Sequence, residues 1–85
     1  MNDIEWKKKA FKQLKRIPKS SQVAIVDSVD MLEQPQELWR NVKSLTNHQH
    51  DYRLRVGRYR VFFNYDGGVE VVSIEEIKKR DERTY

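Results

Sequence analysis

The spacing of apolar residues changes once along the chain, from helical intervals to strict alternation after residue 51. An α-helix returns to the same face about every 3.6 residues, whereas a strand does so at every second residue. Segments 6–17 and 20–33 follow the helical interval. Their apolar stripes are Trp6, Ala10, Leu14 and Ile17 in the first, and Ile25, Val26, Val29 and Leu32 in the second. Because Pro18 lies between them, we predict a hairpin of two helices.

The residues on either side of this hairpin have less regular patterns. Residues 2–5 suit either a helix cap, with Asn2 or Asp3 as the acceptor, or a short edge strand. Within 34–51 the large apolar side chains are expected to be buried anchors; they are Leu38, Trp39, Val42 and Leu45. The polar run TNHQHD, residues 46–51, is expected to be an exposed loop.

After residue 51 apolar side chains recur at every second position in two runs, 52–56 and 59–65, and the positions between them are polar except for Phe62. Gly57 and Arg58 separate the runs, and glycine at the first central position suits a type II′ hairpin turn. A second turn, Asp66-Gly67-Gly68, precedes a third expected strand at 69–77. We therefore predict a single α+β domain over residues 1–85, in which an antiparallel meander of at least three strands packs on the helices.

The predicted turn also determines which side chains of the hairpin face each other. On one face Arg55 lies opposite Arg60, and Arg53 lies opposite Phe62. Like charges in this position destabilise a sheet by up to about 1 kcal/mol, so the arrangement is typical of a site that binds anions. Arginine binds phosphate through paired hydrogen bonds, and an exposed Phe62 would offer a base a stacking surface. The opposite face is apolar and must be covered by the helices; its pairs are Val56–Tyr59, Leu54–Val61 and Tyr52–Phe63.

The distribution of charge along the chain supports a polyanion site. The net charge is +4, and residues 52–65 contain four arginines and no acidic residue, whereas residues 66–77 carry a charge of −4. Positive charge gathered in this way is typical of nucleic-acid sites. Alternatively, Glu70 and Glu76 neutralise the arginines from the next strand, and the C-terminal tail covers Phe62.

Composition excludes several classes of function. The chain has no cysteine, which excludes disulfides, thiolate nucleophiles and cysteine–zinc sites and fits a reducing cytoplasm. No apolar run approaches the roughly 20 residues of a membrane span, and charges occupy the N-terminus where a signal peptide needs its apolar stretch. We expect a cytoplasmic protein without a membrane partner, a metal or a small-molecule cofactor.

The sequence also resembles a known family. The stretch YRLRVGRYRVFF, residues 52–63, resembles the central hairpin of toxins of the RelE/ParE superfamily. A helix from Trp6 that ends in LKRIP, followed by a second helix, is similar to their opening, and residues 71–81 resemble their last strand and basic terminus. The resemblance covers nearly the whole chain. It implies the RelE-like fold, a short first strand, two helices and an antiparallel sheet, and so places a strand at 2–5.

The resemblance implies the toxin component of a type II toxin–antitoxin system, with a cognate antitoxin as partner. RelE-like members cut mRNA in the ribosomal A site, whereas ParE-like members act on DNA gyrase. Matching the chain to the RelE-like branch implies catalytic roles for Arg53, Arg55, Arg60, Arg80 and Tyr85. It implies substrate binding by Phe62 and by Lys79, which is the competing match for Arg80.

The resemblance leaves the general acid and base open. Lysine often occupies the positions of Arg53 and Arg55 in RelE-like members, and arginine is a poor general base because it stays protonated. The other candidates are Glu76, Asp81, Lys79, His48 and His50. Histidine suits proton transfer near neutral pH, but two histidines in a polar loop are also usual in a solvated segment.

The sequence therefore leaves three candidate functions. A ribosome-dependent endoribonuclease that cleaves translated mRNA is favoured, because poisoning of gyrase does not require the arginine cluster. A gyrase inhibitor is the second, and a non-catalytic RNA-binding domain is the third. A lysine cluster in the first helix is either a solvated face or a footing on ribosomal RNA; it consists of Lys7, Lys8, Lys9, Lys12 and Lys15.

Overall fold

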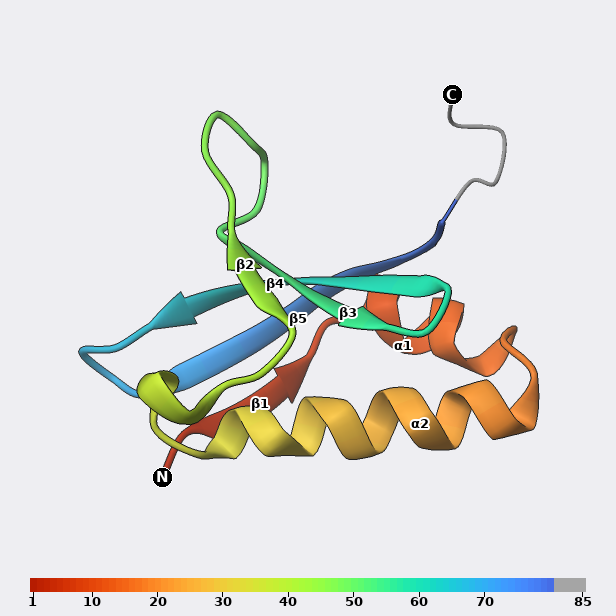
Figure 1. The fold of residues 1–85 in the computed structure, drawn as a ribbon, viewed down its shortest axis with the longest axis horizontal. Coiled ribbons are helices and arrows are strands. Elements are labelled where there is room, and N and C mark those ends of the chain that lie inside the picture. Colours follow the sequence, from red (N-terminus) through yellow and green to blue (C-terminus); the bar gives the residue numbers. More distant parts are fainter. Residues whose placement is uncertain (81–85) are drawn as a thin grey trace.

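A five-stranded sheet forms the centre of the computed structural model, which describes residues 1–80. The strands lie in the order β1-β5-β4-β3-β2 (Figure 1). The first strand runs parallel to β5, and the other neighbours are antiparallel. The strands are β1 (Asp3–Trp6), β2 (Val42–Ser44), β3 (Tyr52–Val56), β4 (Tyr59–Asp66) and β5 (Val71–Lys79). The α+β class and the meander β3-β4-β5 are as predicted.

Two helices lie on one side of this sheet, and the segment between β2 and β3 projects from the other side (Figure 1). They are α1 (Lys8–Lys15) and α2 (Lys19–Asp30), followed by two 3₁₀ turns, Met31–Glu33 and Gln36–Leu38. The predicted helical hairpin is confirmed, but its first helix starts later than expected. Trp6 belongs to β1, opposite Ile74, and the N–H of Lys7 still bonds to the carbonyl of Ile74 at 2.9 Å. The strand alternative for residues 2–5 is therefore the correct one.

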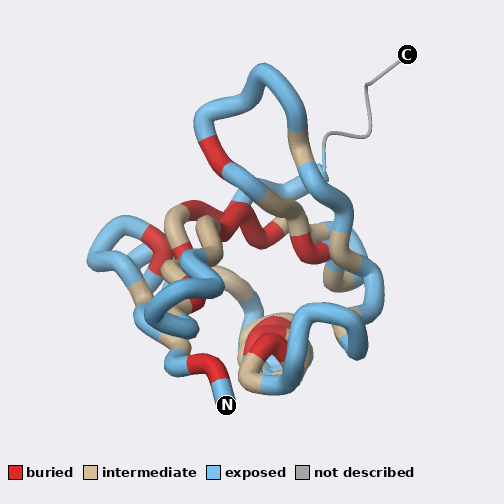
Figure 2. Tube along the Cα trace, turned by 90° about the vertical axis from the view of Figure 1, so that its left-hand side faces the viewer, coloured by how far each residue is buried: buried red, intermediate tan, exposed pale blue. Residues whose placement is uncertain are grey.

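The core lies between the helices and the inner face of the sheet, where the buried segments gather (Figure 2). The apolar stripes of both helices meet the inward side chains of β3, β4 and β5, as their spacing predicts. The most buried members are Ala10, Ile25, Val29, Leu32, Leu54, Val61, Phe63, Val72 and Ile74. Within residues 1–80, no helix is long and apolar enough to cross a membrane.

The segment between the helices and the hairpin departs most from expectation. Residues 42–44 form the edge strand β2, paired with β3. Leu38 is not a buried anchor, since it is 54% exposed. Trp39 packs inward instead, with its ring centroid 5.5 Å from Phe63 and 5.0 Å from Tyr65, and its indole N–H donates to the carbonyl of Gln34 at 2.9 Å. Of the two neighbouring anchors expected here, Leu38 and Trp39, only Trp39 therefore packs against the core.

The register of the central hairpin is the predicted one. Arg55 pairs with Arg60, and Arg53 pairs with Phe62. Gly57 has φ +56° and Arg58 has negative φ, as a type II′ turn requires. A side chain at Gly57 would force an L-residue into the left-handed region, so glycine suits this turn for a conformational reason.

A β-bulge in β5 was not predicted. Phe62 pairs with Glu76 while its neighbour Phe63 pairs with Ile74, so Glu75 is the extra residue. Without it, Ile74 and Glu76 would point to the same side of the sheet. The bulge places Ile74 and Ile77 in the core and directs Glu76 to the face that carries Phe62 and the arginines. The strand also starts at Val71 rather than residue 69, because Glu70 has φ +56°.

Candidate functional site

Five arginines line one cavity of about 150 Å³, and three of them, Arg53, Arg55 and Arg60, belong to the face of the sheet opposite the core. The cavity lies at the turn end of the β3–β4 hairpin, and none of its lining residues within 1–80 is acidic. Its lining residues are Arg53, Arg55, Gly57, Arg58, Tyr59, Arg60 and Arg80. The structure therefore brings together the four arginines predicted as catalytic, together with Arg58.

Local backbone geometry explains how these side chains meet. The two-residue turn sets Arg55 directly across from Arg60, on the same face. At the end of β5, the N–H of Arg80 bonds to the carbonyl of Arg58 at 2.6 Å, which brings Arg80 to the turn. Lys79, the preceding residue, lines a separate cavity with Ser21 and Ala24 of α2. Arg80, and not Lys79, thus joins the arginine cavity. Tyr85 lies outside the described residues.

Four of the five arginines that line this cavity have no carboxylate partner within the described residues. Among residues 1–80, no carboxylate forms an ion pair with Arg53, Arg55, Arg60 or Arg80. The Nε of Arg53 is also buried without a hydrogen-bond partner in that part of the chain. The expected neutralisation by Glu70 and Glu76 is wrong, because Glu70 lies in a turn and Glu76 pairs with other residues. Gathered guanidinium groups without carboxylates form a surface suited to phosphate.

Phe62 does not have the role predicted from the sequence. Its side chain is only 6% exposed and cannot itself stack on a base. The imidazole of His48 lies parallel to it, with centroids 5.2 Å apart and an interplanar angle of 11°, and Lys78 Nζ lies 5.9 Å from its centroid. Within the described residues, the 45–51 loop and β5 cover the ring through His48, His50 and Lys78, and the C-terminal tail expected to cover it lies outside that range beyond residue 80.

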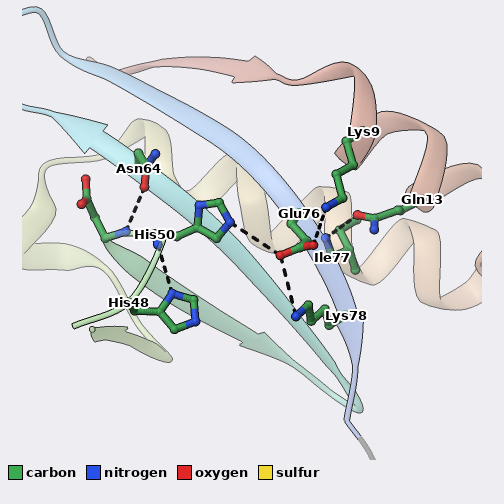
Figure 3. Close-up of polar contacts among 9 residues, drawn as sticks. Lys9, Gln13, His48, His50, Asn64, Glu76, Ile77 and Lys78 are labelled. Atoms are coloured by element: carbon green, nitrogen blue, oxygen red, sulfur yellow. Dashed lines mark hydrogen bonds and ion pairs between the residues drawn. The ribbon is translucent and has the colours of Figure 1, made fainter. Parts of the chain in front are cut away.

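A cluster of polar residues extends the site beyond the arginines (Figure 3). Glu76 is its centre: one carboxylate oxygen lies 2.7 Å from Lys9 Nζ, and the other lies 3.6 Å from His50 Nε2 and 4.0 Å from Lys78 Nζ. His50 is 8% exposed, so the expectation of a wholly exposed loop at 46–51 is wrong for this residue. The backbone N–H of His50 donates to His48 Nδ1 at 3.0 Å. Both histidines therefore lie on the same face of the sheet as the arginines.

The hydrogen bond from Lys9 lowers the pKa of Glu76 below its ordinary value. Burial of the carboxyl acts against this effect, and the charges of Lys78, Lys9 and His50 lower the pKa further. Glu76 therefore stays ionised at neutral pH, and a carboxylate of this kind is a weak proton acceptor. The same carboxylate thus joins Lys9 of α1 to His50 of the 45–51 loop. Gln13 acts beside it, accepting the N–H of Ile77 at 2.7 Å.

Replacing Glu76 by glutamine is expected to lower the free energy of unfolding by about 1 kcal/mol near neutral pH. Because the folded-state pKa lies below the unfolded-state value of about 4.3, this stabilisation is complete above that value. It is lost as the pH falls through the folded-state pKa. Urea denaturation of Glu76→Gln and the unchanged protein at about pH 7 and about pH 3 measures the difference.

Glu75→Gln is the matched control, because Glu75 is the bulge residue and forms no ion pair with another residue in the described range 1–80. The free energies of unfolding of Glu76→Gln and of the unchanged protein should differ more at about pH 7 than at about pH 3. An equal difference at both pH values would contradict a stabilising carboxylate at this position.

The comparison with protein families decides the identity of the fold. The model of the ParE toxin of type II toxin–antitoxin systems, parDE, matches residues 4–84. The chain belongs to this toxin family. A comparison with curated protein sequences found no match.

Solved structures agree with a toxin of the RelE/ParE superfamily. The chain is similar to a chain of the archaeal RelE–RelB complex from Pyrococcus horikoshii, with a TM-score of 0.79, 26% identity, and coverage of 95% of this toxin and 97% of that chain. For a chain of the RelBE2 toxin–antitoxin complex from Mycobacterium tuberculosis, the TM-score is 0.77 and the identity 21%, and the match covers 93% of this toxin and 98% of that chain. For the isolated E. coli RelE toxin, the TM-score is 0.78 and the identity 15%, and the match covers 99% of this toxin and 89% of that chain. The last two likenesses concern the fold alone.

The positions of the toxin's hairpin arginines were predicted correctly from the sequence, whereas those of its histidines were not. The arginines alternate along two strands joined by a two-residue turn, which fixes their register, but His48 and His50 stand in an irregular loop. The available signal was the HQH run just before β3, whose predicted partner strand carries Phe62 on its outer face. A loop next to a partly apolar outer face tends to fold onto it, since this removes apolar surface from water.

Proposed function

We propose that this toxin is a ribosome-dependent endoribonuclease that cleaves translated mRNA. The observation that carries the proposal is the arginine cavity, where Arg53, Arg55, Arg60 and Arg80 lie together without a carboxylate partner in the described range 1–80. The pairing of Arg55 with Arg60 costs stability and is useful when an anion occupies the space between them. A structural sheet face has no need of it.

The chemistry assigned to this cavity is transesterification at a phosphodiester. The 2′-oxygen attacks the adjacent phosphorus and loses its proton, the bond from phosphorus to the 5′-oxygen breaks, and that oxygen takes up a proton. The products are a 2′,3′-cyclic phosphate and a 5′-hydroxyl. Charge on the phosphoryl oxygens grows during attack, and the guanidinium groups of Arg55, Arg60 and Arg80 stabilise it. Proton transfer falls to groups beside the cavity, among which Glu76 is disfavoured by its lowered pKa.

A cognate antitoxin is the proposed protein partner. The similar chains from Pyrococcus horikoshii and Mycobacterium tuberculosis were solved as RelE–RelB and RelBE2 complexes. An acidic segment of the antitoxin would neutralise the arginine cavity and so prevent access of mRNA.

Inhibition of DNA gyrase is the second candidate, favoured by the family description, which names the ParE toxin. One experiment separates the candidates. Purified toxin is added to ribosomes that translate a defined message, and cleavage is mapped by primer extension, while a parallel assay follows supercoiling by gyrase. We expect cleavage within translated codons and unchanged supercoiling. Intact message with inhibited gyrase would replace the nuclease by the second candidate, and intact message with salt-sensitive RNA binding would indicate a non-catalytic RNA-binding domain.

A further inference from the structure

The loop formed by residues 45–51 projects from the outer face of the sheet, and its second half contacts that face. At its base the N–H of Leu45 bonds to the carbonyl of Asp51 at 2.9 Å, and the N–H of Asp51 donates to Asn64 Oδ1 of β4 at 2.8 Å. Near its end, the buried His50 reaches Glu76 of β5 at 3.6 Å (Figure 3). Asp51 and His50 thus anchor the second half of the loop to β4 and β5.

His48 is the aromatic side chain that this loop presents. One face of its imidazole covers Phe62 in a nearly parallel stack, and its Nδ1 accepts a hydrogen bond from the backbone N–H of His50. These two contacts fix both the tilt and the rotation of the ring. His48 is nevertheless exposed, so its exposure comes from the face and edge turned away from Phe62. No other residue in the described part of the chain bonds its Nε2.

The exposed imidazole lies beside the arginine cavity. Phe62, which supports it, is two residues from Arg60 along β4 and points to the same face, a separation of about 7 Å. Across the sheet, Phe62 is also the direct partner of Arg53. A single nucleotide can therefore place its phosphate on the arginines and its base over His48. This is the usual composition of a single-strand site, in which cations hold the backbone and flat rings hold the bases.

We propose that His48 is the stacking surface for one nucleobase of single-stranded RNA whose phosphate occupies the arginine cavity. The inference rests on the proposed function and assigns the position of a base within the same site. It transfers to His48 the role that the sequence suggested for Phe62, and it gives Phe62 the role of a buried support. A stacking surface of this kind accepts any base, because every base has a flat π-face.

The test measures binding of the purified toxin to a fluorescent 2′-O-methyl RNA oligonucleotide, in which the attacking hydroxyl is blocked. His48→Ala is expected to weaken binding between about 5- and 150-fold, the range for loss of one stacked base. His48→Phe is expected to bind within about 3-fold of the unchanged toxin, because the flat ring is kept. On an oligomer of the same backbone without bases, His48→Ala and the unchanged toxin should bind equally.

Gln49→Ala is the matched control, an exposed neighbour in the same loop. If His48→Ala binds no worse than Gln49→Ala while Arg60→Ala loses binding, the stacking role is wrong and the phosphate site stands. If His48→Phe binds as weakly as His48→Ala, the imidazole acts through its nitrogen atoms, which also overturns stacking. If the unchanged toxin and Arg60→Ala bind equally weakly, the cavity does not hold the phosphate of free RNA and this inference is wrong, whereas primer extension on translating ribosomes still decides the proposed function.

Discussion

Replacing Arg60 by alanine is expected to reduce ribosome-dependent cleavage at least about 100-fold, which corresponds to about 2.7 kcal/mol of transition-state stabilisation. The reason is its position: Arg60 lines the cavity and lies across from Arg55, so both guanidinium groups can bind the same phosphate. The rate of cleavage at one mapped codon, at saturating ribosome concentration, measures the effect. Growth after induction of the variant gives the corresponding result in cells.

The same substitution is not expected to harm the fold. It removes a like-charge pair from the sheet, so the free energy of unfolding should stay the same or rise by up to about 1 kcal/mol. Loss of activity without loss of stability is the signature of a functional residue. Arg40→Ala is the control, because Arg40 is an exposed arginine that does not line the cavity. A folded Arg60→Ala variant with full cleavage would remove the arginine cavity from the mechanism.

Phe63→Ala is expected to lower the free energy of unfolding by about 3–5 kcal/mol. The ring is completely buried, stacks on Tyr52 at 5.4 Å and meets the edge of Trp39 at 5.5 Å. Alanine would lose these contacts and leave a cavity where helices and sheet meet. A small domain has a total stability of about 5–15 kcal/mol, so the variant would be only marginally folded at best. Urea denaturation followed by tryptophan fluorescence measures the loss, since Trp39 reports on this contact.

Phe11→Ala provides the comparison, because it makes the same chemical change at a ring that is 46% exposed on α1. Lys15 Nζ lies 4.7 Å from that ring, an exposed cation–π contact, and the expected loss is below about 1 kcal/mol. Similar losses for both variants would show that Phe63 does not belong to the core of this protein.

The two phenylalanines of β4 show why the fold was more predictable than the site. Alternation assigned Phe62 and Phe63 to opposite faces, and the structure confirms this. The exposure of Phe62 could not be read from alternation, because it depends on which segment lies over the outer face. That segment is an irregular loop whose position is set by Asn64 and Glu76, both distant from it in sequence. The exposed position of Leu38 was missed for the same reason, since Trp39 and not its neighbour turned inward.

The β-bulge is the clearest case of a feature that local pattern does not contain. The sequence Ile74-Glu75-Glu76-Ile77 breaks the strict alternation of a strand, and its i, i+3 spacing by itself suits a helix. Only pairing with β4 and cover from α1 decide that Glu75 is the extra residue, and this decision directs Glu76 toward His50 and Lys78.

The sequence by itself determined the two helices, the central hairpin with its register, and the gathering of Arg53, Arg55 and Arg60 on one face. These follow from side-chain periodicity and from a two-residue turn, which act over a few neighbouring residues. The tertiary structure alone decided that Arg80 joins them, that Lys79 does not, and that His48 and His50 cover Phe62. Those contacts join segments far apart in the chain, and their geometry exists only once the core has packed.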